Sequence, residues 1–434
     1  MREVDIVYLY EHAARELDVA CAVTAILRQR GFTTEILQWP TSFFPTVGRF
    51  RPKLVVLPFC YTKKSFWRLL QYWSNAIFFN MTWEQLFYSG NRLAKTPRDD
   101  FALKHVVHHS WSEAYAELLR AQGIAEESIF VNGHPAYALY NAPYRSYFLP
   151  RETLAQRYSL DSARKWVFFP ENYNWAFYTA ATIEQFIKGG QSADDIEVMR
   201  RFCESSLTEV LRWCCDAAQH EEIELIIRPR PATHIDEFKT VVDKVLKDLP
   251  PHLHIIQDES VRDWIMAADT VVSSHSTSLI EAALAEKPAY ILEPSPIPAV
   301  LHVEWHDLLP HLATSDDFHQ VCSAAGMESN DLRLAEWARQ TLLSYGDPIV
   351  NLAGILGRLV TGKIARPPVI IRKKHLSLAK QIIPEWLWVK YHQAVGRRTQ
   401  ILEGYRKDIV LPEELEARIQ RWQLIMSDYF GQKN

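Results

Sequence analysis

Short runs of apolar residues alternate with amphipathic stretches along the first part of the chain. Residues 13–30 carry apolar side chains at helical spacing, and Gly31 ends this predicted helix. A second helix is predicted at 112–122. The intervening runs are rich in β-branched and aromatic residues, which predicts strands at 4–9, 33–37, 54–58, 76–79, 106–107 and 128–131. Short apolar strands separated by helices are typical of a parallel α/β sheet covered on both faces.

The same alternation restarts after a Pro- and Tyr-rich stretch at 135–150. The pattern predicts strands at 166–169, 223–227, 254–256, 270–272 and 289–292, with helices at 193–219, 235–248, 261–267 and 277–285. The last ninety or so residues lack the alternation and are predicted to be helical. We therefore predict domains at 1–150, 151–345 and 346–434, with ligands at the carboxyl ends of the strands.

Composition excludes several classes of protein. The 434 residues include 48 Lys+Arg and 52 Asp+Glu, a net charge of −4 that argues against nucleic-acid binding over the whole surface. Only 15 glycines occur, and neither G-x-G-x-x-G nor a P-loop is present. The six cysteines form no C-x-x-C pair, which predicts buried thiols in the cytoplasm rather than disulfides or a zinc site. The first strand contains Asp5, so no secretory leader is predicted.

Residues 363–407 differ from the rest of the chain in charge. They carry eleven Lys/Arg against Glu385 and Glu403, a local charge of +9 that leaves −13 on the remainder. Trp386, Trp388 and Tyr391 are interleaved with these basic residues. The segment could lie on an anionic membrane surface, or it could be the solvated face of helices that pack against the first domain. Nucleic-acid binding through this segment is a weaker alternative, because the bulk of the chain is acidic.

Two polar turns predict a phosphate site built without glycine. The strand at 223–227 runs into Arg228-Pro-Arg230-Pro, which places two guanidiniums at the carboxyl end of a strand. The strand at 270–272 runs into a hydroxyl-rich turn before a predicted helix: Ser273, Ser274, His275, Ser276, Thr277 and Ser278. Glu281 follows one turn later, where it could accept hydrogen bonds from ribose. Alternatively, the serines cap the helix and Glu281 complements its dipole.

These turns, together with residues 260–290, resemble the C-terminal half of GT-B glycosyltransferases. The likeness is to bacterial surface-carbohydrate biosynthesis proteins, which are relatives of CDP-glycerol glycerophosphotransferases and of CMP-sugar (Kdo, sialic acid) transferases. In that family the Ser/Thr turn holds the nucleotide phosphates, and His usually stands at the position of Arg230. Similar motifs at Arg15–Asp18, Val131–Pro135 and Phe169–Asn174 extend the resemblance over roughly residues 1–300. It implies an α/β fold of two Rossmann-like domains, with acceptor bound by the first and donor by the second, and a helical C-terminal extension.

Glycosyl transfer by such a protein needs a base for the acceptor hydroxyl or a carboxylate nucleophile. Candidates near first-domain strand ends are Glu11, His12, Arg15, Glu16, Asp18, Glu84 and His134. We favour Glu84 for catalysis, with Asp18 and His134, and place Arg15 and Glu16 on the acceptor side. Glu84 could instead be a surface carboxylate, and Glu16 or Asp18 could form a salt bridge. Asn172 and Asn174 lie in an aromatic loop that could stack a base or sugar ring, or simply pack the hinge.

No metal or cofactor is predicted. No Asp-x-Asp occurs, and the arginines supply positive charge for a leaving nucleotide. His105, His108 and His109 have no Cys or carboxylate around them and are interpreted as structural or cleft-lining. The predicted function is a cytoplasmic glycosyltransferase that moves a sugar from a CMP- or CDP-type donor to a lipid-linked surface polysaccharide such as capsule or lipopolysaccharide. The alternatives are a UDP-sugar 2-epimerase-like enzyme and a non-catalytic nucleotide-sugar-binding subunit.

Overall fold

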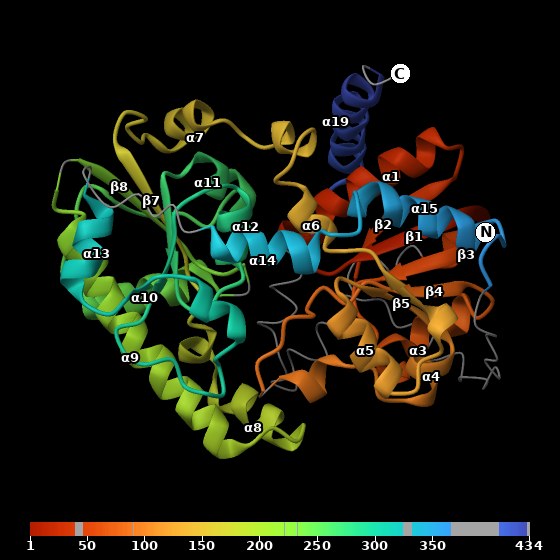
Figure 1. Ribbon diagram of the computed structural model, residues 1–434, viewed down its shortest axis with the longest axis horizontal. Coiled ribbons are helices and arrows are strands. Elements are labelled where there is room, and N and C mark those ends of the chain that lie inside the picture. Colours follow the sequence, from red (N-terminus) through yellow and green to blue (C-terminus); the bar gives the residue numbers. More distant parts are fainter. Residues whose placement is uncertain are drawn as a thin grey trace. The chain divides into compact units, whose positions relative to one another are not determined.

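The computed structural model describes residues 1–39, 47–89, 91–220, 222–231, 233–323, 332–365 and 408–431 (Figure 1). Contacts divide the chain into two compact units. Unit 1 comprises Met1–Gln85, Ala94–Tyr147 and the chain from Thr341 onward, and unit 2 comprises Leu86–Leu93 and Phe148–Gln340. Most of the basic segment, with Trp386, Trp388 and Tyr391, lies outside the described residues.

Unit 1 contains a six-stranded parallel sheet in the order β2-β1-β3-β4-β5-β6. Its strands are β1 (Arg2–Tyr10), β2 (Thr34–Gln38), β3 (Phe50–Leu57), β4 (Ile77–Asn80), β5 (Val106–Ser110) and β6 (Ile129–Val131). The first strand is central, because Ile6 pairs with Thr34 on one side and with Leu54 on the other. The strand order therefore reverses at β1, which creates a switch point between β1 and β3.

Helices cover both faces of this sheet. Figure 1 shows α1 (Asp18–Gln29), α15 (Pro348–Val360) and α19 (Pro412–Gly431) on one side, and α3 (Lys63–Tyr72), α4 (Asp100–Lys104) and α5 (Glu113–Ala121) on the other. Every residue of α1 from Asp18 to Leu27 is buried, because α15 and α19 both pack against it. A π-helical turn, η1 (Ala13–Leu17), precedes α1, and the short α6 (Pro135–Ala138) follows β6.

Unit 2 repeats this architecture with the strand order β12-β11-β10-β7-β8-β9, again all parallel. Its strands are β7 (Lys165–Pro170), β8 (Ile223–Arg228), β9 (Leu253–Ile255), β10 (Thr270–Ser273), β11 (Ala289–Leu292) and β12 (His311–Leu312). Here the order reverses at β7, the first strand of the unit. The corresponding switch point lies between β7 and β10.

The core of unit 2 lies between its sheet and α9 (Ala193–Ala217). Val167, Phe169, Leu225 and Ile227 are fully buried in this cluster, and α10 (Ile235–Val245) and α13 (Ser315–Cys322) extend it. The opposite face is covered by α7 (Arg151–Tyr158), α11 (Val261–Ala267) and α12 (Ser278–Leu284). The remaining helices are α8 (Ala180–Lys188) and α14 (Arg333–Leu342), with 3-10 turns at Val47–Arg49, Arg92–Lys95, Glu126–Ser128, Tyr144–Tyr147, Asn174–Phe177 and Glu304–Leu308.

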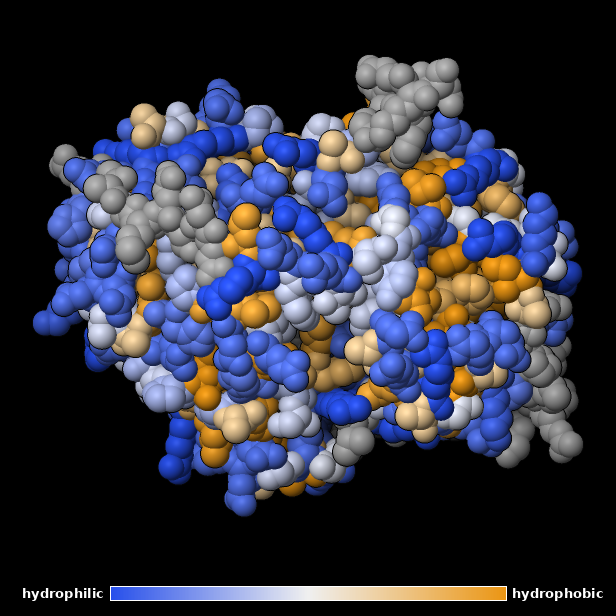
Figure 2. Space-filling view, viewed as in Figure 1, coloured by the Kyte–Doolittle hydropathy of each residue, from blue (hydrophilic) through white to orange (hydrophobic). Residues whose placement is uncertain are grey.

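The predicted α/β class with two parallel sheets is confirmed, and each predicted strand is present with ends shifted by a few residues. The pattern did not predict α3, β12 or the π-helical form of residues 13–17. The surface seen in Figure 2 is mainly hydrophilic, with hydrophobic residues scattered between the charged ones. Among the described residues, no helix has both the length and the apolar character needed to cross a membrane.

Candidate active site

The carboxyl ends of β7 and β10 meet at the switch point of unit 2. Ser273, the last residue of β10, donates a hydrogen bond from Oγ to the carbonyl oxygen of Pro170, the last residue of β7, at 2.5 Å. Both strands then enter polar turns, one starting at Glu171 and the other at Ser274. In open α/β sheets, ligands bind in the crevice at such a point.

The hydroxyl-rich turn after β10 carries buried polar atoms that have no partner among the described residues. Ser273, Ser274 and Ser276 are buried, whereas Thr277 is exposed and Ser278 is half-buried. Ser276 Oγ accepts a hydrogen bond from the Ser278 amide at 3.3 Å. Ser274 Oγ and His275 Nδ1 have no hydrogen-bond partner within the described parts of the chain. Because buried polar groups are normally paired, these two atoms are candidates to contact a ligand.

The two arginines of the Arg-Pro-Arg-Pro turn lie in different surroundings. Arg228 is 6% exposed, and its Nη2 donates to the carbonyl oxygen of Glu259 at 2.9 Å. Burial lowers the pKa of Arg228 to about 10, against the opposing charges of Asp263, Asp258 and Glu281. This side chain therefore braces the turn between β9 and α11 from inside the unit.

Arg230 lies at the switch point itself. It is half-buried, and its charge acts on both turns there. Burial and the Arg230 charge together lower the pKa of His275 to about 4, so this imidazole is neutral near pH 7. The Arg230 charge also opposes the effect of burial on Glu171. Both guanidiniums were predicted to bind phosphate. The Arg230 charge acts on His275 of the hydroxyl-rich turn, whereas Arg228 Nη2 is bonded to the Glu259 carbonyl oxygen and its buried Nε has no hydrogen-bond partner among the described residues.

Glu171 is a switch-point residue that was absent from the predicted site. It is 3% exposed and follows β7 directly. Its Oε1 accepts a hydrogen bond from the Tyr173 amide, and its Oε2 lies 3.5 Å from the Arg230 amide nitrogen. Burial raises the pKa of Glu171 despite the Arg230 charge. The sequence signal for this residue is a carboxylate immediately after a buried strand, next to the predicted Asn172 and Asn174.

The other predicted donor residues lie around this centre. Glu281 is buried on α12, and its Oε2 is 3.5 Å from Arg262 Nε, so its carboxylate is directed toward α11. Asn174 Nδ2 donates to the Tyr178 hydroxyl at 3.1 Å, and Asn172 is half-buried beside it. Because α12 has only seven residues, its dipole contributes less to anion binding than the predicted longer helix would.

In unit 1, one arginine forms hydrogen bonds with three carboxylates near the carboxyl ends of β1 and β4. Arg15, on the π-helical turn, donates to Glu16 at 2.6 Å, to Glu84 at 3.0 Å and to Glu11 at 3.2 Å. Glu16 is fully buried, and burial raises its pKa even though the Arg15 charge opposes this shift. π-Helical turns of this kind often occur at functional sites.

Glu84 is held by two cations. Besides Arg15, Lys95 forms an ion pair with its second carboxylate oxygen, and the Glu84 side chain is 40% exposed. A carboxylate stabilised in this way by two positive charges is a weak base. The structure therefore brings Arg15, Glu16 and Glu84 together, and it engages Glu84 in ion pairs.

His12 forms a dyad with a residue from the far end of the chain. Its Nδ1 lies 2.9 Å from Asp408 Oδ2, and the His12 side chain is 30% exposed. Burial lowers the pKa of His12, but the hydrogen bond with Asp408, together with the negative charges of Glu11 and Asp408, holds the pKa above its ordinary value of 6.5. An imidazole oriented by a carboxylate is a common general base.

Asp18 and His134 lie outside this cluster. Asp18 is buried and faces α19, with its Oδ1 3.7 Å from Arg418 Nη1. His134 is 5% exposed and stacks between Trp111 and Tyr137, with ring centroids 3.8 and 3.7 Å away. Its Nδ1 accepts a hydrogen bond from the Ala136 amide at the start of α6, a packing and capping environment.

Two of the three histidines near β5, His108 and His109, lie in buried structural surroundings. His108 and His109 are fully buried, and burial lowers their pKa values to about 4 and about 3. His108 Nε2 lies 2.8 Å from the Ala102 carbonyl oxygen, and His109 Nε2 lies 3.2 Å from Asn132 Nδ2. Both imidazoles are therefore neutral members of buried hydrogen-bond networks.

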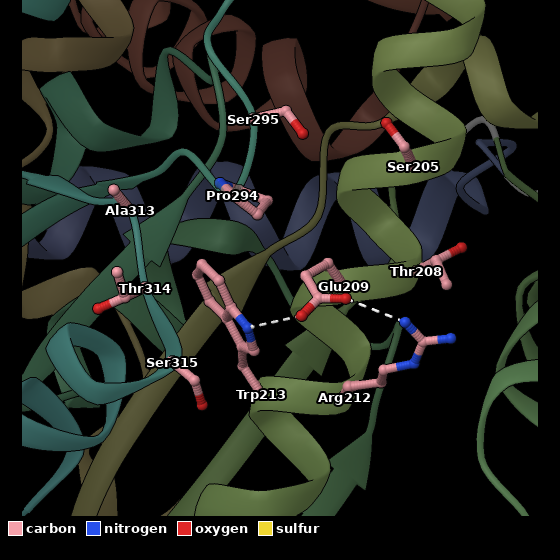
Figure 3. A pocket seen from close by; sticks show the side chains of 10 residues that line it. All are labelled: Ser205, Thr208, Glu209, Arg212, Trp213, Pro294, Ser295, Ala313, Thr314 and Ser315. Atoms are coloured by element: carbon pink, nitrogen blue, oxygen red, sulfur yellow. Dashed lines mark hydrogen bonds and ion pairs between the residues drawn. The ribbon is translucent and has the colours of Figure 1, made fainter.

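A groove of about 590 Å³ in unit 2 is separate from the switch point (Figure 3). One wall is a face of α9, and the other is formed by the loops that follow β11 and β12. Trp213 Nε1 lies 3.2 Å from Glu209 Oε1, and Arg212 Nη1 lies 3.0 Å from Glu209 Oε2. The remaining lining residues are Ser205, Thr208, Pro294, Ser295, Ala313, Thr314 and Ser315. None of the predicted donor residues lines this groove.

Comparison with known proteins identifies the fold. No protein-family model matches the sequence, and no curated protein does either. The chain is similar to the solved structure of a putative UDP-N-acetylglucosamine 2-epimerase from Listeria monocytogenes, with a TM-score of 0.51 and 14% identity over 86% of this chain and 100% of that one. It is also similar to the wall teichoic acid polymerase TagF, with a TM-score of 0.51 and 9% identity over 83% of this chain and 89% of that one. These likenesses confirm the predicted GT-B fold.

Proposed function

We propose that the protein is a glycosyltransferase that moves a sugar from a nucleotide-activated donor to a surface glycan. The observation that carries this proposal is the switch point of unit 2. There, Arg230 lies beside a turn in which Ser274 Oγ and His275 Nδ1 are buried without hydrogen-bond partners among the described residues. Positive charge and unsatisfied polar atoms at the carboxyl ends of parallel strands suit a nucleotide phosphate.

The proposal assigns stabilisation of the leaving group to unit 2. When the bond between the sugar and the nucleotide phosphate breaks, negative charge develops on the phosphate oxygens. The Arg230 guanidinium and the Ser274 hydroxyl can donate hydrogen bonds to these oxygens, which lowers the barrier electrostatically. His275 is neutral near pH 7, so it can donate or accept a hydrogen bond but does not serve as a strong acid.

Acceptor activation is assigned to unit 1, with His12 as the base in place of Glu84. His12 Nδ1 faces Asp408, and Nε2 lies 4.0 Å from Glu11 Oε2. We assign to Nε2 the proton of an acceptor hydroxyl as its oxygen attacks the anomeric carbon. The ion pairs of Glu84 with Arg15 and Lys95 make it less basic. The same carboxylates are suited to hold sugar hydroxyls, since carboxylates accept strong hydrogen bonds.

We further propose a CMP- or CDP-type donor and a lipid-linked acceptor at the cytoplasmic face of the membrane. A structure of TagF soaked with CDPG, with a TM-score of 0.50 and 9% identity, supports the cytidine donor. The +9 charge of residues 363–407 supports attraction to anionic lipid. Liposomes rich in anionic lipid should therefore retain the protein at low salt, and recovery of all the protein in the supernatant would contradict the membrane proposal.

A UDP-sugar 2-epimerase activity is the second candidate. The specific observation in its favour is the likeness to the Listeria protein over the whole length of that chain. An epimerase needs no acceptor, so incubation of the protein with UDP-N-acetylglucosamine alone would yield an epimer detectable by NMR. Release of nucleotide that depends on an added glycan would instead support transfer.

The first test of nucleotide binding is a thermal-shift panel with CMP, CDP, UDP, GDP and ADP. A ligand present at about 100 times its Kd adds about 2.7 kcal/mol to the free energy of unfolding. We expect a cytidine nucleotide to give the largest stabilisation. If no nucleotide stabilises the protein, the proposed function is wrong.

A further inference from the structure

Glu171 joins the turn after β7 to the Arg-Pro-Arg-Pro turn after β8. Its amide donates to the Arg228 carbonyl oxygen at 3.0 Å, and its Oε2 is 3.5 Å from the Arg230 amide nitrogen. Its Oε1 accepts from the Tyr173 amide within its own turn. Glu171 is thus fixed by both turns and cannot swing away without breaking these contacts.

A buried carboxylate in this position needs a counter-charge. Glu171 is 3% exposed, and the cation whose charge acts on it is Arg230. The other titratable groups whose charges couple to Glu171 are the Tyr173 hydroxyl and the Cys203 thiol of α9, both uncharged near pH 7 because burial raises their pKa values. His275, on the turn after β10, senses the same Arg230 charge. The Glu171 carboxylate thus lies 3.5 Å from the Arg230 amide nitrogen, and the Arg230 charge favours its ionised form.

We propose that Glu171 is the counter-ion of Arg230 in the ligand-free site, and that nucleotide phosphate binding at Arg230 is accompanied by uptake of one proton from solvent at Glu171. This inference rests on the proposed function. A phosphate that contacts Arg230 brings a second anion close to the buried Glu171 carboxylate, on which the Arg230 charge already acts. Because the two anions repel each other in a site of low dielectric constant, protonation of the carboxylate removes the conflict. Burial already raises the pKa of Glu171, so the proton costs less there than on an exposed carboxylate.

The direction in which Glu171→Gln changes nucleotide affinity distinguishes this proposal from direct contact between Glu171 and the ligand. Replacement of Glu171 by Gln keeps the side-chain size and a hydrogen-bond acceptor but removes the charge. Nucleotide affinity should then increase by about three- to tenfold near neutral pH, because the repulsion is gone. If Glu171 instead accepted hydrogen bonds from ribose or sugar hydroxyls, its replacement by Gln would weaken nucleotide binding.

The experiment measures the Kd of CDP-glucose and UDP-glucose by isothermal titration calorimetry between about pH 6 and about pH 8. Both probes are diphosphate diesters whose charge is constant over this range, so any proton that is taken up belongs to the protein. Wild-type binding should tighten toward low pH by up to about tenfold per pH unit. The dependence of the binding enthalpy on the buffer should give a proton uptake that approaches one and that disappears in Glu171→Gln.

A matched control is Glu224→Gln. Glu224 is a buried carboxylate, 4% exposed, on β8 of the same sheet, where it pairs with Arg164 and His254 rather than with Arg230. This variant should keep the wild-type Kd and its pH dependence. If Glu171→Gln does not fold, the wild-type series still decides, because a Kd independent of pH overturns the inference.

The outcomes separate this inference from the function on which it rests. If neither sugar nucleotide binds the wild-type protein and the thermal-shift panel is also negative, the proposed function fails, and this inference fails with it. If wild type binds but Glu171→Gln binds more weakly, Glu171 contacts the ligand directly and this inference alone is wrong.

Discussion

His12 Nδ1 lies 2.9 Å from Asp408 Oδ2, although 396 residues separate the two in the sequence. Asp408 also accepts a hydrogen bond from the Ala13 amide at 2.9 Å, and its carbonyl oxygen accepts one from the Tyr10 hydroxyl at 2.8 Å. The carboxyl end of β1 is therefore completed by the part of the chain that follows the basic segment. This relationship makes the dyad testable from either residue.

Asp408→Asn should shift the pH dependence of sugar transfer. The hydrogen bond with Asp408 and the charges of Asp408 and Glu11 together hold the pKa of His12 above 6.5 against burial, and the variant removes the Asp408 charge. Because a base works in its unprotonated form, the acidic limb of the kcat/KM profile should move to lower pH, while the rate at its plateau falls. The charge interaction stabilises the fold below about pH 6.5 and is lost as pH rises through the pKa of His12 in the folded protein. An unchanged acidic limb would contradict the dyad.

His12→Ala should abolish transfer without loss of nucleotide binding. Removal of a general base lowers kcat by about 10²- to 10⁴-fold, while the thermal shift with nucleotide stays at its wild-type value. Glu84→Gln is the comparison variant, because Glu84 is a neighbour held by Arg15 and Lys95. We expect less than about a tenfold decrease for Glu84→Gln. The reverse order of effects would restore Glu84 as the base.

The two arginines after β8 should respond differently to truncation. Arg230→Ala should raise the Kd for nucleotide by about 10- to 100-fold, as expected for loss of hydrogen bonds to a charged ligand, with little change in stability. Arg228→Ala should destabilise unit 2 by about 3 kcal/mol, because it removes a buried cation whose charge acts on the buried Asp263 and Glu281 carboxylates. Urea unfolding and calorimetric titration of both variants make this comparison. Equal effects on nucleotide affinity would show that both guanidiniums reach the phosphate.

Gly133→Ala should loosen the attachment of the returning chain to unit 1. Gly133 has φ +83°, and a Cβ there would lie 2.7 Å from the Leu342 carbonyl oxygen. Gly123 is a matched control, since its φ is +87° and no atom lies within 4 Å of an added Cβ. Gly123→Ala should cost about 1–2 kcal/mol from backbone strain alone, and Gly133→Ala should cost clearly more. Similar unfolding free energies for the two variants would refute this role for the turn.

Most of the fold could be predicted because each strand is a short apolar run with a strong local signal. Strand β12 has only two residues, so it has no period to detect. Helix α3 places Phe66, Leu69 and Leu70 in the core beside Trp73. The apolar stretch at its C-terminal end continues into β4, so the helical period could not be recognised in the sequence. The π-helical turn at Ala13–Leu17 depends on the hydrogen bonds that its neighbours make, and no local pattern encodes it.

The site was less predictable because it depends on contacts between distant residues. Arg228 and Arg230 are the same residue type two positions apart. Only the packing around β8 determines that Arg228 is buried and bonded to the Glu259 carbonyl oxygen, while the Arg230 charge acts at the switch point. Asp408 has no local feature that connects it with β1. Glu84 follows a buried strand as a base would, but its two cationic partners come from residues 69 positions before it and 11 after it in the sequence.

The path of the chain constrains how this protein can change over evolution. Leu86–Leu93 belongs to unit 2 although unit 1 flanks it on both sides, and Thr341 onward returns to unit 1. No single break in the gene yields two fragments that each encode one complete unit. If recombination exchanged one half of the coding region, each unit of the product would therefore contain segments from two different parent proteins. Specificity for donor and for acceptor should accordingly be inherited as one linked trait, and should diverge by point substitution rather than by exchange of modules.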